Sequence, residues 1–198
     1  MRFLLAVLFS SGILAAQNFF GFAAGISTLS ADAAKLGSPA TALSQYKPEN
    51  GASISAMGGR HFSDWWSAQI TYGWNRNSVV LSGIVPSGAY EIPLRSNMHT
   101  VLGEAQFYFR PRANRIRPYL AAGPGGVFER AASGSNFKES SFAFRVAVGL
   151  DAQLSKRFSL RYTFGETLQA NWFSQRLLPP GSRKLANFQN QWGALWRF

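Results

Sequence analysis

Two residues at the spacing of a base and a nucleophile are the first candidates for chemistry in this sequence. His61 and Ser63 flank Phe62, and a histidine beside a serine can activate the hydroxyl for attack on an ester or amide. Such a site also needs an acidic group that orients the histidine. The second histidine, His99, has no serine two residues after it. His61-Phe62-Ser63 is therefore the triplet on which an enzymatic hypothesis rests.

Four charged residues lie on the polar side of segments in which polar and apolar residues alternate. They are Glu104, Arg145, Asp151 and Arg161. If this side lines a narrow interior of low dielectric constant, each charge is costly unless it is paired. We therefore expect these four residues to form ion pairs, either as plain structural neutralisation of the charges, which we favour, or as a network that also plugs or gates the interior.

Cysteine is absent from the chain. Its absence excludes disulfides, thiolate catalysis and cysteine-based zinc sites. We expect no cofactor, no metal site and no catalytic residue, and the His61 triplet carries only an alternative hypothesis.

The chain is strongly basic but does not carry the pattern of a nucleic-acid-binding protein. Its 20 Lys and Arg exceed its 9 Asp and Glu, which gives a net charge of +11. The basic residues are scattered singly apart from Arg110, Arg112, Arg115 and Arg117. No Lys/Arg-rich run and no recognition helix accompanies them, so we expect no nucleic-acid partner.

The N-terminus predicts export. Met1-Arg2 is a short positive region, 3–14 is apolar, and Leu14-Ala15-Ala16 offers small residues for cleavage before Gln17. This arrangement is typical of a secretory signal peptide and is too short for a membrane span. We therefore assign residues 1–16 to a signal peptide and residues 17–198 to one domain.

The remaining chain alternates with a period of two, which predicts strands. In 141–154, Phe142, Phe144, Val146 and Val148 share one face, opposite Arg145 and other small or polar residues. The segment at 51–62 has an ambiguous face, because Ser53 and Arg60 cannot both point inward without a bulge. Eight segments are predicted, at about 18–29, 51–62, 66–77, 98–109, 118–128, 141–154, 158–168 and 186–198.

The connections between these segments alternate in length. Short ones are predicted at 63–65, 110–117 and 155–157, and long ones at 30–50, 78–97, 129–140 and 169–185. Outer-membrane barrels alternate in this way, with short periplasmic turns and longer extracellular loops. We therefore expect the long connections outside the cell and the short ones in the periplasm.

Composition indicates which face points outward. The chain is 15% aromatic and only 15% charged, and its polar faces carry Ser, Gln, Thr, Gly and Asn with few charges. Such a face is a poor solvent surface but fills a narrow lumen well. The prediction is an all-β fold, an eight-stranded antiparallel up-and-down transmembrane β-barrel, too narrow for a general diffusion pore.

A likeness to a known family is carried by three stretches: RPYLAAGPGG at 117–126, RVAVGLDAQLSKRFSLRYTF at 145–164 and NQWGALWRF at 190–198. They resemble small bacterial outer-membrane β-barrel proteins of the OmpA-type transmembrane domain class. Trp192, Trp196 and Phe198 fit the register of that family's C-terminal assembly signal. The resemblance implies insertion into the Gram-negative outer membrane by the barrel-assembly machinery, and it implies no chemical activity.

The expected function is therefore non-enzymatic: a monomeric integral outer-membrane protein with a structural or surface-exposed role in the envelope. Two alternatives stay open, a lipid A-modifying enzyme of the deacylase kind that uses the His61 triplet and a narrow porin-like channel. The expected partners are membrane lipid and lipopolysaccharide, whose phosphates basic side chains can bind. The candidate contacts are Arg76, Arg95, Arg130 and Lys138.

Overall fold

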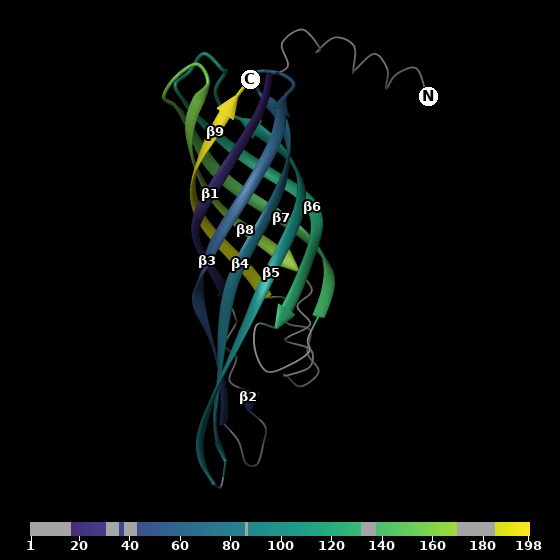
Figure 1. Cartoon of the computed structure of the whole chain (residues 1–198), viewed down its shortest axis with the longest axis vertical. Helices are drawn as coiled ribbons and strands as arrows, with labels where there is room; N and C mark the ends of the chain where they lie inside the picture. The colour runs from purple at the N-terminus through teal and green to yellow at the C-terminus, as the bar shows by residue number, and fades with distance from the viewer. Residues whose placement is uncertain (1–16, 31–35, 38–42, 86, 132–137, 170–184) are drawn as a thin grey trace, which may run out of the picture.

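The computed structural model describes residues 17–30, 36–37, 43–85, 87–131, 138–169 and 185–198. They form one antiparallel barrel, which confirms the predicted fold class (Figure 1). Its strands are β1 (Gln17–Ser30), β3 (Leu43–His61), β4 (Trp66–Val85), β5 (Gly88–Tyr108), β6 (Ile116–Ala131), β7 (Lys138–Gln153), β8 (Phe158–Gln169) and β9 (Leu185–Arg197). The two-residue strand β2 (Leu36–Gly37) pairs only with β3. Within these residues no helix could span a membrane.

The barrel closes because β1 pairs with both of its neighbours. Its residues pair with β3 from Gln17↔His61 to Thr28↔Asn50, and with β9 from Phe19↔Arg197 to Ser30↔Ala186. Asn18 and Phe198 also exchange backbone hydrogen bonds of 3.2 and 3.0 Å where β1 begins and β9 ends. Closure leaves no open sheet edge, which would cost several kcal/mol per unpaired group in hydrocarbon.

The two ends of the barrel differ. At the end that we call the turn end, the short connections 62–65, 109–115 and 154–157 lie together with the start of β1 and the end of β9. It is the upper end in Figure 1. At the opposite end, the loop end, β3, β4 and β5 continue as a long sheet beyond the barrel wall (Figure 1).

This extension corrects the predicted loop at 78–97. The β4–β5 ladder continues without interruption from Asn77↔Ser96 to Val85↔Gly88, and Gly88 adopts φ 132° beside the turn at Ser87. Only glycine adopts this conformation readily. The segment contains β-branched residues that favour strands, and Ser78, Ser82, Gly83, Pro93 and Ser96 lie within the ladder. A single tight turn therefore replaces the predicted loop. Likewise 44–49, part of the predicted loop at 30–50, pairs with β4.

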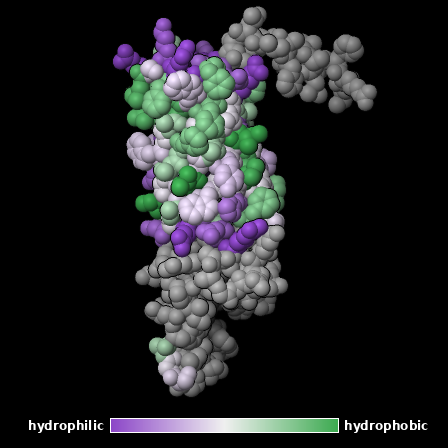
Figure 2. Space-filling view, viewed as in Figure 1, coloured by the Kyte–Doolittle hydropathy of each residue, from purple (hydrophilic) through white to green (hydrophobic). Residues whose placement is uncertain are grey.

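The inward and outward faces are those that the alternation predicted. Along β7, Phe142, Phe144, Val146 and Val148 are exposed on the barrel exterior, whereas Arg145 is buried inside. Figure 2 shows the exterior as an apolar band between two hydrophilic rims. Such a band is what a bilayer requires of a barrel.

The structure shows which residue of β3 points inward, the strand whose faces were ambiguous in the sequence. Ser53 is buried in the lumen and Arg60 is exposed on the exterior. The pairing of β3 with β4 keeps one register from Ser53 to His61, so no bulge separates these residues. The irregularity lies between Glu49 and Ser53 instead.

Candidate functional site

The barrel lumen is filled by polar side chains, and it is the candidate functional site. Buried apolar residues form only small clusters within the described residues, such as Phe19, Ala23, Met57 and Leu195. Serines, threonines and glutamines occupy most of the other inward positions. Every second residue of each strand points into the lumen, so a sequence with polar residues at these positions builds a polar interior.

One ion pair lies near the turn end. Arg161 on β8 and Asp151 on β7 are register partners. The Arg161 Nε atom lies 2.7 Å from Asp151 Oδ1, and its Nη2 atom lies 2.7 Å from Oδ2. The Tyr108 hydroxyl donates to Oδ2 at 2.9 Å. This two-pronged geometry is the strongest form of the arginine–carboxylate pair, and all three groups are buried.

A second ion pair lies farther along the lumen. Arg145 on β7 approaches Glu104 on β5, with 3.3 Å between Nη1 and Oε1. The other oxygen of Glu104 accepts hydrogen bonds from Gln69 at 2.8 Å and from Thr71 at 2.6 Å. The Nε and Nη2 atoms of Arg145 are buried without a hydrogen-bond partner among the described residues. This pair is therefore longer and less complete than the first.

Gln69 joins the two pairs into one network. Its amide nitrogen donates to Glu104, and its amide oxygen accepts from Arg161 Nη1 at 2.9 Å. Hydrogen bonds thus run from Arg145 through Glu104, Gln69 and Arg161 to Asp151. The four residues singled out in the sequence all belong to this network. Sequence reasoning missed Gln69 and Tyr108, although their inward positions on alternating strands were readable.

Two inward glycines make room for the large side chains of the lumen. A Cβ atom at Gly165 would lie 2.9 Å from Arg145 Nε. A Cβ atom at Gly149 would lie 2.3 Å from the Tyr119 ring, whose hydroxyl is hydrogen-bonded to Thr163 at 2.5 Å. These glycines therefore have a packing role, because a barrel of eight strands holds little space.

Further arginines gather where the lumen opens at the turn end. Arg117 lies over the Tyr108 ring, 3.7 Å from its centroid, and donates to the Asp64 carbonyl at 2.7 Å. Arg112 donates to the Ser63 carbonyl at 2.8 Å and lies 3.7 Å from the exposed Asp64 carboxylate. Burial lowers the pKa of Arg112, and the Asp64 charge opposes this shift. Backbone carbonyls of the turns thus hold these guanidinium groups in place.

The His61 triplet does not form a base–nucleophile pair. His61 points into the lumen, packed against the Phe19 and Tyr108 rings at 4.9 and 5.5 Å. Ser63 is in the turn, where its hydroxyl accepts hydrogen bonds from the backbone amides of Trp65 and Trp66. Neither nitrogen of the His61 ring has a hydrogen-bond partner among the described residues. The two side chains therefore serve different parts of the fold.

The second histidine faces the opposite side of the wall. His99 Nδ1 lies 2.7 Å from the Tyr72 hydroxyl, and both side chains belong to the outward face of β4 and β5. Among the described residues, no cluster of three metal-binding side chains is found.

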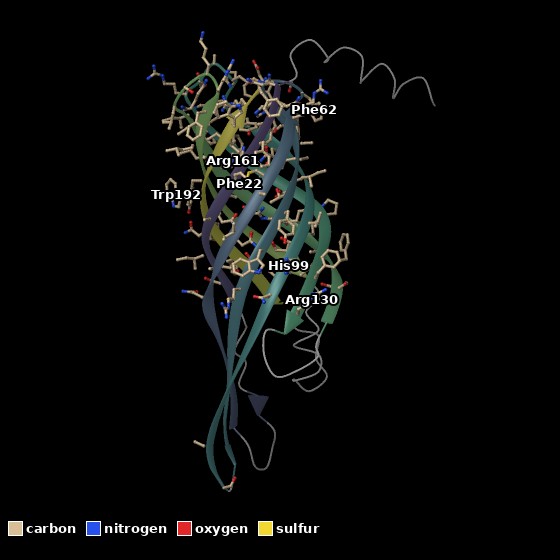
Figure 3. All side chains as sticks on the ribbon, in the orientation of Figure 1. Phe22, Phe62, His99, Arg130, Arg161 and Trp192 are labelled. Carbon is tan, nitrogen blue, oxygen red and sulfur yellow. The ribbon has the colours of Figure 1, made fainter. Side chains whose placement is uncertain are left out.

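The candidate lipopolysaccharide contacts are only partly described. Arg76 on β4 is exposed. Arg130 is exposed close to the loop end of β6 (Figure 3). The side chains of Arg95 and Lys138 lie outside the described set, as does the assigned signal peptide at 1–16.

The aromatic residues of the assembly segment lie on the exterior of β9. Trp192 and Phe198 are 65% and 67% exposed, and Trp196 is also exposed. The Trp192 ring lies 4.7 Å from the Tyr162 ring on β8, and Figure 3 shows Trp192 at the outer edge of the barrel, with Arg161 labelled nearer the turn end. These residues share the outward face, as their register predicted.

Comparisons with known proteins agree with this architecture. A family model described as outer membrane protein beta-barrel domain matches residues 1–197. No curated protein matches the chain.

Three solved structures share the fold. Neisserial surface protein A (NspA) has a TM-score of 0.60 and 14% identity, over 92% of this chain and 99% of its own. OprG from Pseudomonas aeruginosa has a TM-score of 0.57 and 12% identity, over 91% and 96%. Ail from Yersinia pestis, solved with the heparin analogue sucrose octasulfate, has a TM-score of 0.52 and 14% identity, over 92% and 97%.

Proposed function

Because the chain belongs to the outer membrane protein beta-barrel domain family and is a bacterial outer-membrane protein, we propose that it acts there without enzymatic activity. In this proposal it is a closed barrel with a structural role in the envelope, and it presents its loop end at the cell surface. The observation that carries the proposal is the hydrogen-bonded network of Arg145, Glu104, Gln69, Arg161 and Asp151, which crosses the lumen where Arg161 on β8 contacts Gln69 on β4.

The network supports a plugged lumen rather than a channel. An open water-filled pore would hydrate its lining, whereas Arg161, Asp151, Glu104 and Arg145 are all buried. Each of these charges is paired with an opposite charge from another strand. A path for ions would require several of these contacts to break together.

The surroundings of His61 support a non-enzymatic role. An acyl-transfer site needs the histidine within hydrogen-bond reach of the nucleophile and beside an orienting acid. The Ser63 hydroxyl is instead engaged by the turn backbone, and the nearby Asp64 carboxylate faces Arg112. The substrate of a lipid-modifying enzyme would also have to reach a ring that lies inside the barrel.

A measurement of ion conductance tests whether the lumen is plugged. The purified barrel in a planar lipid bilayer is expected to give no stable ion conductance. Arg145→Ala removes the side chain with the least complete set of contacts and is expected to raise the frequency of conducting events. Steady single-channel steps in the wild type would contradict the plug and favour the porin-like alternative.

Release of acyl chains tests the absence of enzymatic activity. Purified protein incubated with lipid A is expected to release no fatty acid above a boiled control. Turnover that is lost in both His61→Ala and Ser63→Ala would overturn the proposal, because it would require the triplet to act as a catalytic pair.

We also propose that the loop end lies outside the cell, where Arg76, Arg95, Arg130 and Lys138 would contact lipopolysaccharide phosphates. Guanidinium and ammonium groups bind phosphate through charge-assisted hydrogen bonds. Single cysteines introduced at residues 64 and 134 can be labelled in intact cells, because the chain has no cysteine of its own. Labelling at 134 but not at 64 is expected, and the reverse would overturn the orientation.

Insertion by the barrel-assembly machinery is the proposed route into the membrane, with Trp192, Trp196 and Phe198 as its signal. Phe198→Ala removes an exposed ring, which costs at most about 1–3 kcal/mol of transfer energy. We expect its refolding yield in detergent to be near normal and its outer-membrane abundance in cells to be depleted. Equal losses in both measurements would assign Phe198 to packing alone.

A further inference from the structure

The buried charges of the lumen do not balance. Among the described residues, four arginines are buried on the inner face, Arg117, Arg145, Arg161 and Arg197, against two carboxylates, Glu104 and Asp151. Glu104 forms an ion pair with Arg145, and Asp151 forms one with Arg161. Arg117 and Arg197 face no carboxylate within ion-pair distance in the described part of the chain. Two buried arginines therefore have no carboxylate ion-pair partner among the described residues.

The two uncompensated arginines lie at the same end of the lumen. Arg117 begins β6 and Arg197 ends β9, and both strand termini belong to the turn end. Arg117 is 1% exposed and Arg197 is 4% exposed. Their existing contacts are with neutral groups: Arg117 donates to two backbone carbonyls, and Arg197 Nη2 donates to the Ser159 hydroxyl at 2.7 Å.

Both guanidinium groups also have donors to spare. Arg117 Nη1 and Arg197 Nε are buried without a hydrogen-bond partner among the described residues, and so are both ring nitrogens of His61. His61 is 1% exposed and interacts electrostatically with Arg117, Arg112 and Arg197. A buried charge without counter-charge or full hydrogen bonding is among the costliest features of a fold.

We propose that the turn end of the lumen binds a compact inorganic anion, chloride or phosphate, between Arg117, Arg197 and His61. Such an anion supplies the missing negative charge and accepts hydrogen bonds from the unused donors. A neutral imidazole contributes one further N–H donor. The bound anion would close the lumen at the end where the ion-pair network stops, and this inference does not depend on how the loop end functions.

Anion-dependent stability tests the proposal. The mature barrel is folded in a neutral detergent in sodium gluconate, whose anion is too large for a buried site. Chloride or phosphate then replaces gluconate at constant ionic strength, and heat unfolding is followed by gel mobility. A saturable stabilisation is expected, which reaches about a 100-fold shift of the unfolding equilibrium at 100 times the dissociation constant.

Variants separate this site from general charge effects. Arg197→Gln and Arg117→Gln are expected to lose most of the anion-dependent shift. Arg115→Gln is the matched control, since it removes the same charge from an exposed position at the same end, and it should keep the shift. Arg145→Gln should also keep it, because Glu104 already neutralises that arginine.

Chloride NMR gives a direct readout that does not require any variant to fold. The wild-type barrel is expected to broaden the chloride line saturably, and phosphate that shares the site should reverse this broadening. Broadening without reversal assigns the site to chloride, and stabilisation by phosphate alone assigns it to phosphate. Equal stability in gluconate, chloride and phosphate, together with no saturable broadening, would overturn the proposal. An unchanged anion response in both Arg197→Gln and Arg117→Gln would also overturn it.

Discussion

The Asp151–Arg161 pair and the Glu104–Arg145 pair contain the same chemical groups but are held differently. Arg161 contacts both oxygens of Asp151 at 2.7 Å and also donates to Gln69 and Tyr108. Arg145 contacts one oxygen of Glu104 at 3.3 Å and leaves two nitrogens unpartnered among the described residues. All three side-chain nitrogens of Arg161 therefore have hydrogen-bond partners, whereas among the described residues only one of the three in Arg145 does.

The difference follows from strand geometry. Asp151 and Arg161 sit opposite each other on adjacent strands, where facing side chains are close enough for direct contact. Glu104 and Arg145 lie on β5 and β7, which are separated by β6, so Arg145 must reach past Gly123, its register partner on β6. We infer that the first pair anchors the turn end, whereas the second is where the lumen can rearrange.

The sharpest test of the anchor is Arg161→Gln, which has the largest expected effect. It leaves Asp151 buried with only the Tyr108 hydroxyl, and breaking a buried pair in this way typically costs about 3–5 kcal/mol. Urea unfolding in lipid vesicles measures the loss. A loss below that of Arg145→Gln would reverse the ranking of the two pairs.

Arg145→Gln tests the looser pair and is expected to cost less, about 1–3 kcal/mol. Glu104 retains its hydrogen bonds from Gln69 and Thr71, and two buried, unpartnered nitrogens are removed. The same unfolding assay applies. A loss equal to that of Arg161→Gln would show that the 3.3 Å contact is as strong as the two-pronged one.

The bridge between the pairs can be measured by a double-mutant cycle. Arg145→Gln and Arg161→Gln combined should deviate from additivity by about 0.5–1 kcal/mol, because Gln69 contacts both Glu104 and Arg161. In a Gln69→Leu background the deviation should fall to near zero. A coupling that survives this change would show that the two pairs communicate without Gln69.

The smallest effect is expected from a substitution on the outside of the barrel. This substitution is a control for the two ion pairs of the lumen. Gly103 lies one residue from Glu104 on β5, but a Cβ added there meets no atom within 4 Å. Gly103→Val should therefore change stability by no more than about 0.5 kcal/mol. A larger loss would mean that the wall next to Glu104, and not the pairing of its carboxylate, dominates stability.

Much of the site was readable from the sequence because alternation along a strand assigns each side chain to a face. It placed Glu104, Arg145, Asp151 and Arg161 inside and the aromatic residues of β9 outside. It did not reveal which arginine contacts which carboxylate, because that depends on distances across the closed barrel. It also gave no reason to select Gln69 from the other inward polar residues.

Local composition misled the prediction in one region and left it undecided in another. The Ser, Gly and Pro of 78–97 suggested a loop, whereas ladder pairing continues to Val85↔Gly88. The face of Arg60 depended on whether β3 contains a bulge, and pairing with β1 and β4 on both sides fixes that. Pairing between strands is a tertiary property, so composition within one segment cannot determine it.

The sequence by itself determined the eight strands of the barrel wall, the two faces of every one except β3, and the barrel, because a period of two with apolar and polar sides allows few other folds. Only the tertiary structure decided the register at which the barrel closes. Closure brings β4, β5, β7 and β8 around one lumen and joins two ion pairs through Gln69. It also gathers Arg117, Arg197 and His61 at one end, where neither arginine has an ion pair with a carboxylate of the described residues. A side chain's face depends on its own strand, but its partners across the lumen depend on all the strands together.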